Sequence, residues 1–373
     1  MLWATLNLPC NTHFLPMQSN KPECDSRRAK EKIAKNVLNR YMLRYFSLFL
    51  YFLMTSAMSC LDETGKEVDI WVAIKAPKGT DYLYYDSSTN VFKESPNSMN
   101  DTSTGALSFT TKQLWTANVY ALWNDEVPNE NNYSFSYGHT KGFFAFDTNH
   151  SGYLLIHSIP AFPIGPSQSP MYLGLGGNAW TYAQSLLCVS VSAETLNAVA
   201  YKYILNKPHL YDILFPSSYK PIYGNISNLV SGYSTTAKLC ASDLLATQGN
   251  VSFQLFAKTE QWNNDLYSAC VTPTYQTDLW TETWIRGSAE GPSCPSSGYD
   301  TLDIQGLDFG NGMKWSETND HSKWAIALNK NIVCIGDINR MTTQYSRGGG
   351  TACLSNTILF QSFQTAVTGT DSC

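Results

Sequence analysis

The stretch His139-Thr140-Lys141-Gly142-Phe143-Phe144-Ala145-Phe146-Asp147 leads into a polar turn, residues 148–152, and then into Tyr153-Leu154-Leu155-Ile156-His157-Ser158. A short apolar run, a cluster of turn residues and a second apolar run are typical of a β-hairpin. A similar stretch begins at His321-Ser322-Lys323, is apolar from Trp324 to Leu328, and turns at residues 329–331 before Ile332 to Asp337. The paired His and paired Lys residues are each 182 positions apart. This spacing predicts two related halves that face each other across a shared site.

The two H-x-K motifs are the candidate active site. On a strand, residues i and i+2 share a face, so His139 and Lys141 point the same way, as do His321 and Lys323. A single H-x-K is most simply the exposed end of a strand. Two copies at matching hairpin positions, among five histidines after residue 59, instead indicate a cleft with two imidazoles and two ammonium groups.

The composition indicates a folded, strand-rich protein of the α/β or α+β class. Of 373 residues, 43% are hydrophobic and only 15% are charged, and aromatic residues are plentiful. The first 41 residues differ from the rest: they carry a basic run without a strand pattern and are expected to be a dispensable leader. Residues 42–59 combine Arg44, a short apolar run and a small-x-small site before Cys60, which predicts a signal peptide. The run is too short for a comfortable membrane anchor, so none is expected after cleavage.

Cysteines and glycosylation signals also indicate the secretory pathway. Eight of the ten cysteines follow residue 59, and an even set in an oxidising compartment predicts disulfides rather than metal ligands. There is no C-x-x-C pair and no acidic cluster with metal-ligand spacing, so neither a metal nor a cofactor is expected. Five N-x-Ser/Thr sequons, at Asn100, Asn132, Asn149, Asn225 and Asn250, are candidate glycosylation sites.

The net charge is unusual for a protein that binds nucleic acid. Residues 1–59 hold eight Lys/Arg and three Asp/Glu, which leaves 17 against 27 in the remainder, a net charge of −10. Nucleic-acid binders normally carry a basic surplus. Acid pH would reduce this repulsion because it neutralises carboxylates and charges histidines.

Several motifs, in order from about Cys60 to Cys373, resemble the deoxyribonuclease II family of acid endonucleases. The motifs are Gly138-His139-Thr140-Lys141-Gly142, Leu155-Ile156-His157-Ser158-Ile159-Pro160, Asp320-His321-Ser322-Lys323-Trp324, Cys334-Ile335-Gly336-Asp337-Ile338-Asn339-Arg340 and Arg347-Gly348-Gly349-Gly350. That family in turn resembles the phospholipase D fold, in which two H-x-K motifs share one active site. The resemblance implies two pseudo-symmetric halves, residues 60–215 and 216–373, each with a mixed β-sheet flanked by helices and with the active site between them.

The resemblance also implies roles for individual residues. The catalytic set is His139, Lys141, His157, His321 and Lys323, and the expected substrate contacts are Ser158, Asp337, Asn339 and Arg347. The Arg347-Gly348-Gly349-Gly350 segment could wrap a phosphate with its N–H groups, or form a tight turn before Cys353. The implied disulfides join Cys60 to Cys188, Cys294 to Cys373 and Cys334 to Cys353, which leaves Cys240 and Cys270 as a fourth pair.

The chemistry that follows is metal-free hydrolysis of DNA. By likeness to phospholipase D, one motif histidine attacks phosphorus to form a phosphohistidine, the other protonates the leaving 5′ oxygen, and the lysines hold the phosphate. His139 as nucleophile and His321 as acid is our hypothesis. The products would be 3′-phosphate and 5′-hydroxyl ends, and the enzyme would act in lysosomes or outside the cell, including on DNA of dying cells.

Two other functions stay open at this point. One is a phospholipase D-like phosphodiesterase with another substrate, which a comparison of DNA with phospholipid turnover would separate. The other is a secreted, non-catalytic DNA-binding protein on a nuclease scaffold. The intact set of His139, Lys141, His157, His321 and Lys323 disfavours it, because a binding protein has no chemical need for all five.

Overall fold

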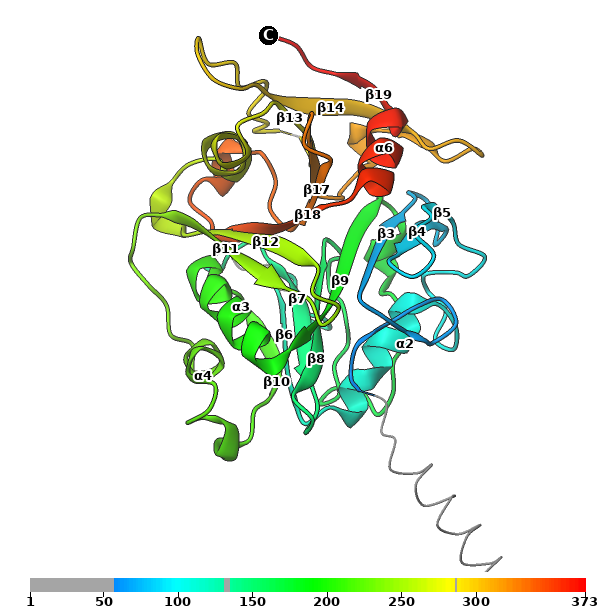
Figure 1. The fold of residues 1–373 in the computed structure, drawn as a ribbon, viewed down its shortest axis with the longest axis vertical. Coiled ribbons are helices and arrows are strands. Elements are labelled where there is room, and N and C mark those ends of the chain that lie inside the picture. Colours follow the sequence, from blue (N-terminus) through cyan, green and yellow to red (C-terminus); the bar gives the residue numbers. More distant parts are fainter. Residues whose placement is uncertain (1–56, 131–134, 286) are drawn as a thin grey trace, which may run out of the picture. The chain divides into compact units, whose positions relative to one another are not determined.

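A computed structural model describes residues 57–130, 135–285 and 287–373 of the 373-residue chain. These residues form one compact unit that contains two large β-sheets (Figure 1). The first sheet has the order β10-β6-β7-β8-β9-β3-β4-β5. Its strands are β3 (Ile70–Lys75), β4 (Tyr82–Asp86), β5 (Lys93–Glu94), β6 (Val119–Asn124), β7 (Lys141–Phe146), β8 (Ser151–His157), β9 (Gln184–Ser192) and β10 (Leu210–Leu214).

The second sheet has the order β11-β12-β18-β17-β16-β13-β14-β15, and β19 pairs with β14. Its strands are β11 (Cys240–Ala246), β12 (Ser252–Lys258), β13 (Leu279–Glu282), β14 (Thr301–Asp308), β15 (Lys314–Ser316), β16 (Trp324–Ala327), β17 (Ile332–Gly336), β18 (Gly349–Ser355) and β19 (Val367–Thr370). All these strands follow residue 239, whereas every strand of the first sheet precedes residue 215. A separate two-stranded sheet pairs β1 (Cys60–Leu61) with β2 (Glu67–Val68).

The two large sheets share a common core arrangement. In the first, β6-β7-β8-β9 lie side by side and α3 (Ala193–Asn206) follows β9. In the second, β13-β16-β17-β18 repeat this order and α6 (Thr357–Ala366) follows β18. Each H-x-K motif stands at the start of the second of these strands, β7 or β16. The predicted α/β fold with two related halves is therefore confirmed, although mixed pairing occurs only in the second sheet, between β13 and β14.

Both predicted hairpins are present, and their turns explain the residues found there. β7 pairs with β8 and β16 pairs with β17, both antiparallel. The first turn places His150 at φ 60°, and the second places Asn329 and Asn331 at φ 65° and 52°. This left-handed conformation is most accessible to Gly, Asn, Asp and His among the residue types. The turns lie at the end of each hairpin that is remote from the H-x-K motif.

The helices pack around a hydrophobic cluster that the two halves share. Helix α3 begins at Ser192, whose Oγ accepts a hydrogen bond from Thr195 N, and α6 begins similarly at Asn356. Helix α3 packs on β8 and β9 of its own sheet and also on β12 and β18 of the other (Figure 1). The described residues also form three short α-helices: α2 (Ala106–Lys112), α4 (Gly224–Val230) and α5 (Thr272–Tyr275). A large cluster of buried side chains from both sheets fills the space between them, and each half also has a smaller buried cluster of its own.

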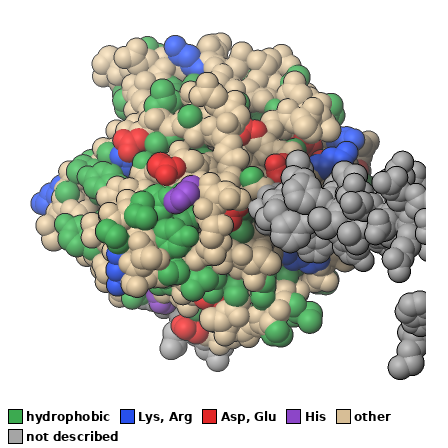
Figure 2. All heavy atoms as spheres, turned by 60° about the horizontal axis from the view of Figure 1, so that its bottom comes forward, with side chains coloured by type: hydrophobic (Ala, Val, Ile, Leu, Met, Phe, Trp, Pro, Cys, Tyr) green, Lys and Arg blue, Asp and Glu red, His purple; other side chains and the backbone are tan. Residues whose placement is uncertain are grey.

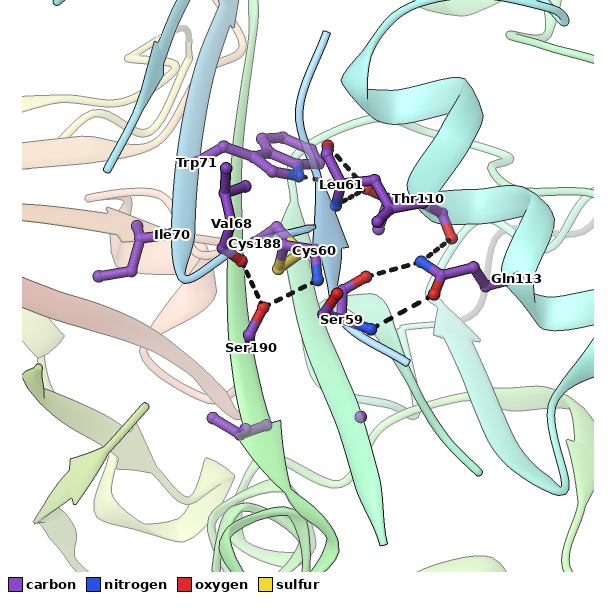
Figure 3. The surroundings of a disulfide bond; sticks show 12 residues. Ser59, Cys60, Leu61, Val68, Ile70, Trp71, Thr110, Gln113, Cys188 and Ser190 are labelled. Atoms are coloured by element: carbon purple, nitrogen blue, oxygen red, sulfur yellow. Dashed lines mark hydrogen bonds between the residues drawn. A yellow bond between two sulfur atoms is a disulfide. The ribbon is translucent and has the colours of Figure 1, made fainter. Parts of the chain in front are cut away.

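The four predicted disulfides are present in the structure: Cys60–Cys188, Cys240–Cys270, Cys294–Cys373 and Cys334–Cys353. Cys60–Cys188 attaches β1 to the centre of the first sheet, beside hydrogen bonds from Cys60 N to Ser190 Oγ and from Ser190 Oγ to Val68 O (Figure 3). Cys334–Cys353 links directly opposite residues of β17 and β18. Because Gly336 ends β17, this bridge also fixes the segment that enters the site described below.

Removing the Cys60–Cys188 bridge should strongly lower the free energy of unfolding. The bridge spans 128 residues, and in the loop-entropy model a closed loop of about 100 residues contributes roughly 4–5 kcal/mol. A Cys60→Ser/Cys188→Ser protein should therefore unfold at clearly lower urea concentration than the unmodified protein. Non-reducing peptide mapping checks the pairing itself, and a free thiol at Cys334 or Cys353 would contradict it.

The leader (residues 1–41) and most of the predicted signal peptide (42–59) lie outside the described residues. Met58 and Ser59 are described and are 5% and 2% exposed. Met58 N donates to Asp147 Oδ2, and Gln113 Nε2 donates to Ser59 O. Cleavage directly before Cys60 would remove these contacts, and the cleavage site stays a prediction.

Of the five sequons, four lie in the described part of the chain. Asn149 and Asn250 are exposed, Asn100 and Asn225 are half-buried, and Asn132 falls among residues that the structure does not describe. Asn149 and Asn250 lie in the β7–β8 and β11–β12 turns, which hydrogen bonds from Gln248 to Ser151 and Gly152 hold together. Within the described residues, no helix has the length and apolar character needed to cross a membrane.

Candidate active site

One cavity of about 610 Å³ lies where the H-x-K ends of the two sheets meet. It brings together residues from both halves, although the two motifs are 182 positions apart in the sequence. Seven of the nine predicted catalytic and substrate-contacting residues line it: His139, Lys141, Ser158, His321, Lys323, Asn339 and Arg347. The remaining lining residues are Glu126, Phe135, Pro160, Trp284, Met341, Thr343 and Gln344.

Close backbone contact between the halves fixes His139. Its N–H donates to Gly348 O in the second half, at 2.8 Å. A Cβ on Gly138 would lie 2.0 Å from Asn206 O, and a Cβ on Gly348 would lie 2.2 Å from the same atom. Glycine is therefore required at both positions, since no side chain fits between the end of α3 and these segments.

The surroundings of His139 favour a neutral ring with a lone pair facing the cavity. His139 Nδ1 lies 2.5 Å from Asp337 O, and a carbonyl can only accept, so Nδ1 carries the hydrogen. This leaves Nε2 without a hydrogen in the neutral ring. Burial and the positive charge of Lys141 lower the pKa of His139 well below its ordinary value, and the charge of Asp125 only partly offsets them. His139 therefore has the tautomer and charge of a nucleophile.

Asp125 is the charged centre of the first half of the site. It follows β6, is fully buried, and accepts hydrogen bonds from Lys141 Nζ and from Arg347 Nη2 at 2.9 Å. Its Oδ2 also lies 4.0 Å from His139 Nε2. Burial alone would raise the pKa of Asp125, but the charges of Lys141 and Arg347 outweigh it and hold that pKa well below the ordinary value. One carboxylate thus holds a lysine and an arginine from different halves at the cavity.

The second motif is arranged differently. His321 is half-buried, and its ring stacks on Tyr182 with 3.8 Å between centroids and 7° between planes. Lys323 is 3% exposed, and its Nζ donates to His321 O at 2.5 Å. Burial and the charge of Lys141 lower the pKa of Lys323 to about 7. This lysine therefore loses its positive charge as the pH rises through about 7.

Two predicted residues lie behind the cavity wall. His157 is fully buried between Phe143 and Phe162, and its Nδ1 accepts a hydrogen bond from Ile159 N. Burial lowers the pKa of His157 to about 3, so the ring is neutral in the folded protein. Asp337 is 1% exposed, and its carboxylate accepts from Thr140 Oγ1 and Gly350 N. Burial raises the pKa of Asp337 to about 7, despite these hydrogen bonds.

The segment around Arg347 is a strand entry rather than a phosphate-wrapping loop. Gly349 begins β18, and Gly350 N donates to Asp337 instead of facing the cavity. The Arg347 side chain is 4% exposed and, besides Asp125, donates to Tyr137 O and Gly138 O. Lys258 Nζ donates to the carbonyls of Gln344, Tyr345 and Arg347 and so fixes the backbone of this segment. The sequence left open a phosphate-wrapping loop or a tight turn before Cys353, and the structure agrees better with the turn.

The sequence analysis missed residues that adjoin the predicted ones in space. They are Asp125, Tyr182, Trp284 and Lys258. A signal for Asp125 exists: it is the first charged residue after the apolar run Val119–Trp123, and Lys141 begins the neighbouring strand. Tyr182 and Lys258 stand in two further stretches that resemble the same family, Thr181-Tyr182 to Ser190 and Phe256-Ala257-Lys258, but no role in the site was predicted for them from the sequence. For Trp284 there is no local signal, because aromatic residues are common throughout the chain.

The cavity is rich in positive charge, and one face of the surface can be compared with it. On the face drawn in Figure 2, Lys and Arg side chains are scattered among hydrophobic and uncharged ones. In the described part of the chain, the one group with metal-ligand spacing is Cys294, Asp300 and Cys373, and its two sulfurs form a disulfide. Three cationic side chains line the cavity: Lys141, Lys323 and Arg347.

Known proteins are similar to this sequence over most of its length. A family described as Deoxyribonuclease II matches residues 59–373. A "Putative deoxyribonuclease-2" from Burkholderia thailandensis is 36% identical over 334 residues, covering 82% of this chain and 91% of that protein. "Deoxyribonuclease-2-beta" from Homo sapiens is 31% identical over 366 residues, with 92% and 99% covered. "Cell death-related nuclease 6" from Caenorhabditis elegans is 30% identical over 347 residues, with 85% and 90% covered.

Among solved structures, yeast tyrosyl-DNA phosphodiesterase matches 58% of this chain and 66% of its own, with 9% sequence identity and a TM-score of 0.31. The sequence relationship is much stronger and covers nearly the whole described part of the chain. The predicted resemblance is therefore confirmed at the level of the family. The chain belongs to the deoxyribonuclease II family.

Proposed function

We propose that this protein is an acid endonuclease that hydrolyses DNA through a phosphohistidine on His139, without a metal ion. The observation that supports the proposal most is the single cavity lined by both H-x-K motifs. Family membership supports DNA as the substrate, since the relatives named above are deoxyribonucleases or a nuclease. Lysosomes or the extracellular space, where DNA of dying cells accumulates, are the proposed places of action.

In the first step, His139 Nε2 attacks the phosphorus and the bond from phosphorus to the 5′ oxygen breaks. His321 gives its proton to that oxygen, so a 5′-hydroxyl end leaves and the 3′ side stays attached to His139 through phosphorus. Lys141, Lys323 and Arg347 stabilise the negative oxygens of the phosphate, with Ser158 and Asn339 as further contacts. Asp337 orients His139 through its carbonyl oxygen.

In the second step, water attacks the same phosphorus and the bond to His139 breaks. Neutral His321 takes the proton of the water, which restores its charge for the next cycle and releases a 3′-phosphate end. His157 has no place in this sequence of proton transfers, because it is neutral and fully buried. We propose that His157 supports Lys141 from the neighbouring strand rather than contacting the substrate.

The titration of the site supports an acid optimum. Below about pH 7, Lys323 is positive and Asp337 is neutral, so the cavity is more attractive to phosphate than at higher pH. His139 remains neutral well below pH 6.5, because its pKa is lowered. On acidification His139 therefore stays a nucleophile, while Lys323 gains its positive charge and Asp337 loses its negative charge. We propose an optimum at about pH 5, which these shifts and the weaker repulsion between DNA and an acidic protein support in direction.

Purified protein should nick plasmid DNA in the presence of EDTA, with activity that falls as the pH rises through about 7. The nucleophile, the acid and the positive charge are all side chains, so chelation removes nothing that the reaction needs. End-labelling of the fragments should show 3′-phosphate and 5′-hydroxyl termini. Termini with 5′-phosphate, or activity that returns only with added Mg²⁺, would show that the histidine mechanism is wrong.

A further inference from the structure

The ring of His321 lies between two aromatic side chains. Tyr182 stacks on it at 3.8 Å between centroids, and Trp284 lies at 4.3 Å with 41° between planes. A ring stacked at 3.8 Å occupies one face, so Trp284 contacts the opposite face. The aromatic pair is therefore formed by one residue from each half of the protein, since Tyr182 precedes β9 and Trp284 follows β13.

Hydrogen bonds of the neighbouring backbone hold both aromatic residues in place. Ala183, next to Tyr182, forms a parallel bridge with Asp320: Ala183 N donates to Asn319 O and His321 N donates to Ala183 O, both at 3.0 Å. Trp284 N donates to Asn339 Oδ1 at 3.3 Å. Tyr182 and Trp284 thus reach His321 from segments that are anchored at their own backbone.

The charges around His321 explain why its contact with the Tyr182 and Trp284 rings would help catalysis. Lys323, two residues further along the chain, donates to its carbonyl oxygen, and His139, Lys141, Arg347 and Glu126 line the same cavity. Asp320 is buried beside it and hydrogen-bonds Trp315 and Ser322 N. Three nearby cations disfavour a charged imidazole, whereas the negative face of an aromatic ring favours one.

We propose that Tyr182 and Trp284 are positioning residues that keep His321 aligned and stabilise its protonated form for donation to the leaving 5′ oxygen. The inference rests on the proposed function, because it gives His321 the role of acid. It accounts for a difference between the two motifs: charged groups surround His139, while aromatic rings cover His321. Similar H-x-K motifs then perform opposite proton chemistry because their surroundings differ.

The test compares substitutions that remove a ring with substitutions that keep it. Trp284→Leu and Tyr182→Leu each remove one aromatic face, whereas Trp284→Phe and Tyr182→Phe keep a face. Tyr299→Leu is the control, because Tyr299 is 42% exposed and does not line the cavity. We expect each Leu substitution at Trp284 or Tyr182 to lower kcat on DNA about 10-fold and to shift the high-pH limb of activity to lower pH. The Phe variants and Tyr299→Leu should stay within about 2-fold of wild type, since the aromatic faces remain.

A second substrate separates loss of the acid from general damage. The p-nitrophenyl ester of thymidine 3′-phosphate has a leaving group that departs without protonation, so its first step does not need His321 as an acid. We expect the Leu variants to release the first equivalent of nitrophenolate at nearly the wild-type rate, and His139→Ala to release none.

Each outcome decides a different point. If wild type cleaves DNA but the Leu variants keep its pH profile, the role of the aromatic pair is wrong while the proposed function stands. Equal loss on DNA and on the ester would also overturn the inference, because it would show structural damage. If Trp284→Leu does not fold, the same question is answered by comparing kcat and the pH profile of Tyr182→Leu with those of Tyr182→Phe. If wild type cleaves no DNA at any pH, the proposed function itself fails.

Discussion

Replacing His139 or His321 by alanine should lower DNA cleavage by about 10⁴-fold or more, while the protein remains folded and secreted. Each substitution removes one half of a reaction that needs both a nucleophile and an acid. Residues that act as one unit are not additive, so the double variant should be little worse than either single variant. Plasmid nicking and steady-state cleavage of a labelled oligonucleotide measure the effect.

The matched control is His150→Ala. His150 is exposed in the β7–β8 turn, at the opposite end of the hairpin from His139, and its ring adjoins the Tyr223 hydroxyl. Its removal should leave cleavage within about twofold of wild type, as is usual for surface substitutions away from a site. If His321→Ala cleaved DNA as well as wild type, the two halves would not share one active site.

Asp125→Asn should damage both stability and activity. The substitution leaves Lys141 and Arg347 buried without their shared carboxylate, and breaking a buried ion pair in this way costs about 3–5 kcal/mol. The two cations would then repel each other and move, and small displacements of catalytic groups cost about 10²-fold in rate. Urea unfolding and kcat/KM at acid pH should fall together.

Asp308→Asn provides the comparison. Asp308 pairs with Lys314 at 3.1 Å, but both side chains are well exposed, so solvent replaces the interaction. Its unfolding midpoint and kcat/KM should match those of wild type. If Asp125→Asn behaved like Asp308→Asn, Asp125 would have no role in holding the two cations.

The sequence predicted the parts of the site that carry a repeated pattern. The hairpins at residues 139–158 and 321–337 could be identified because their apolar runs and turn residues recur at matching positions. The presence of His139, Lys141, His321 and Lys323 in one cavity followed from that repeat and from the family resemblance. Three of the disulfides were predicted by the resemblance and the fourth, Cys240–Cys270, as the pair that remained, since spacing does not determine pairing.

What the sequence did not predict depends on contacts between distant segments. Asp125 meets Arg347 across 222 positions, and Tyr182 meets His321 across the bridge between Ala183 and Asp320. The burial of His157 was also missed, because the outward or inward direction of a residue at a strand end depends on the sheet that packs against it. Such partners have no period or motif, and only the assembled fold brings them together.

The most direct test of the account is to identify the residue that carries phosphate during turnover. Wild-type protein is mixed with an oligonucleotide, quenched with base within one turnover, and mapped by mass spectrometry of its peptides. We expect a nucleotide joined through its 3′ phosphate to the peptide that contains His139, absent in His139→Ala and lost on brief acid treatment. No adduct during active cleavage, or an adduct on His321 instead, would contradict the account.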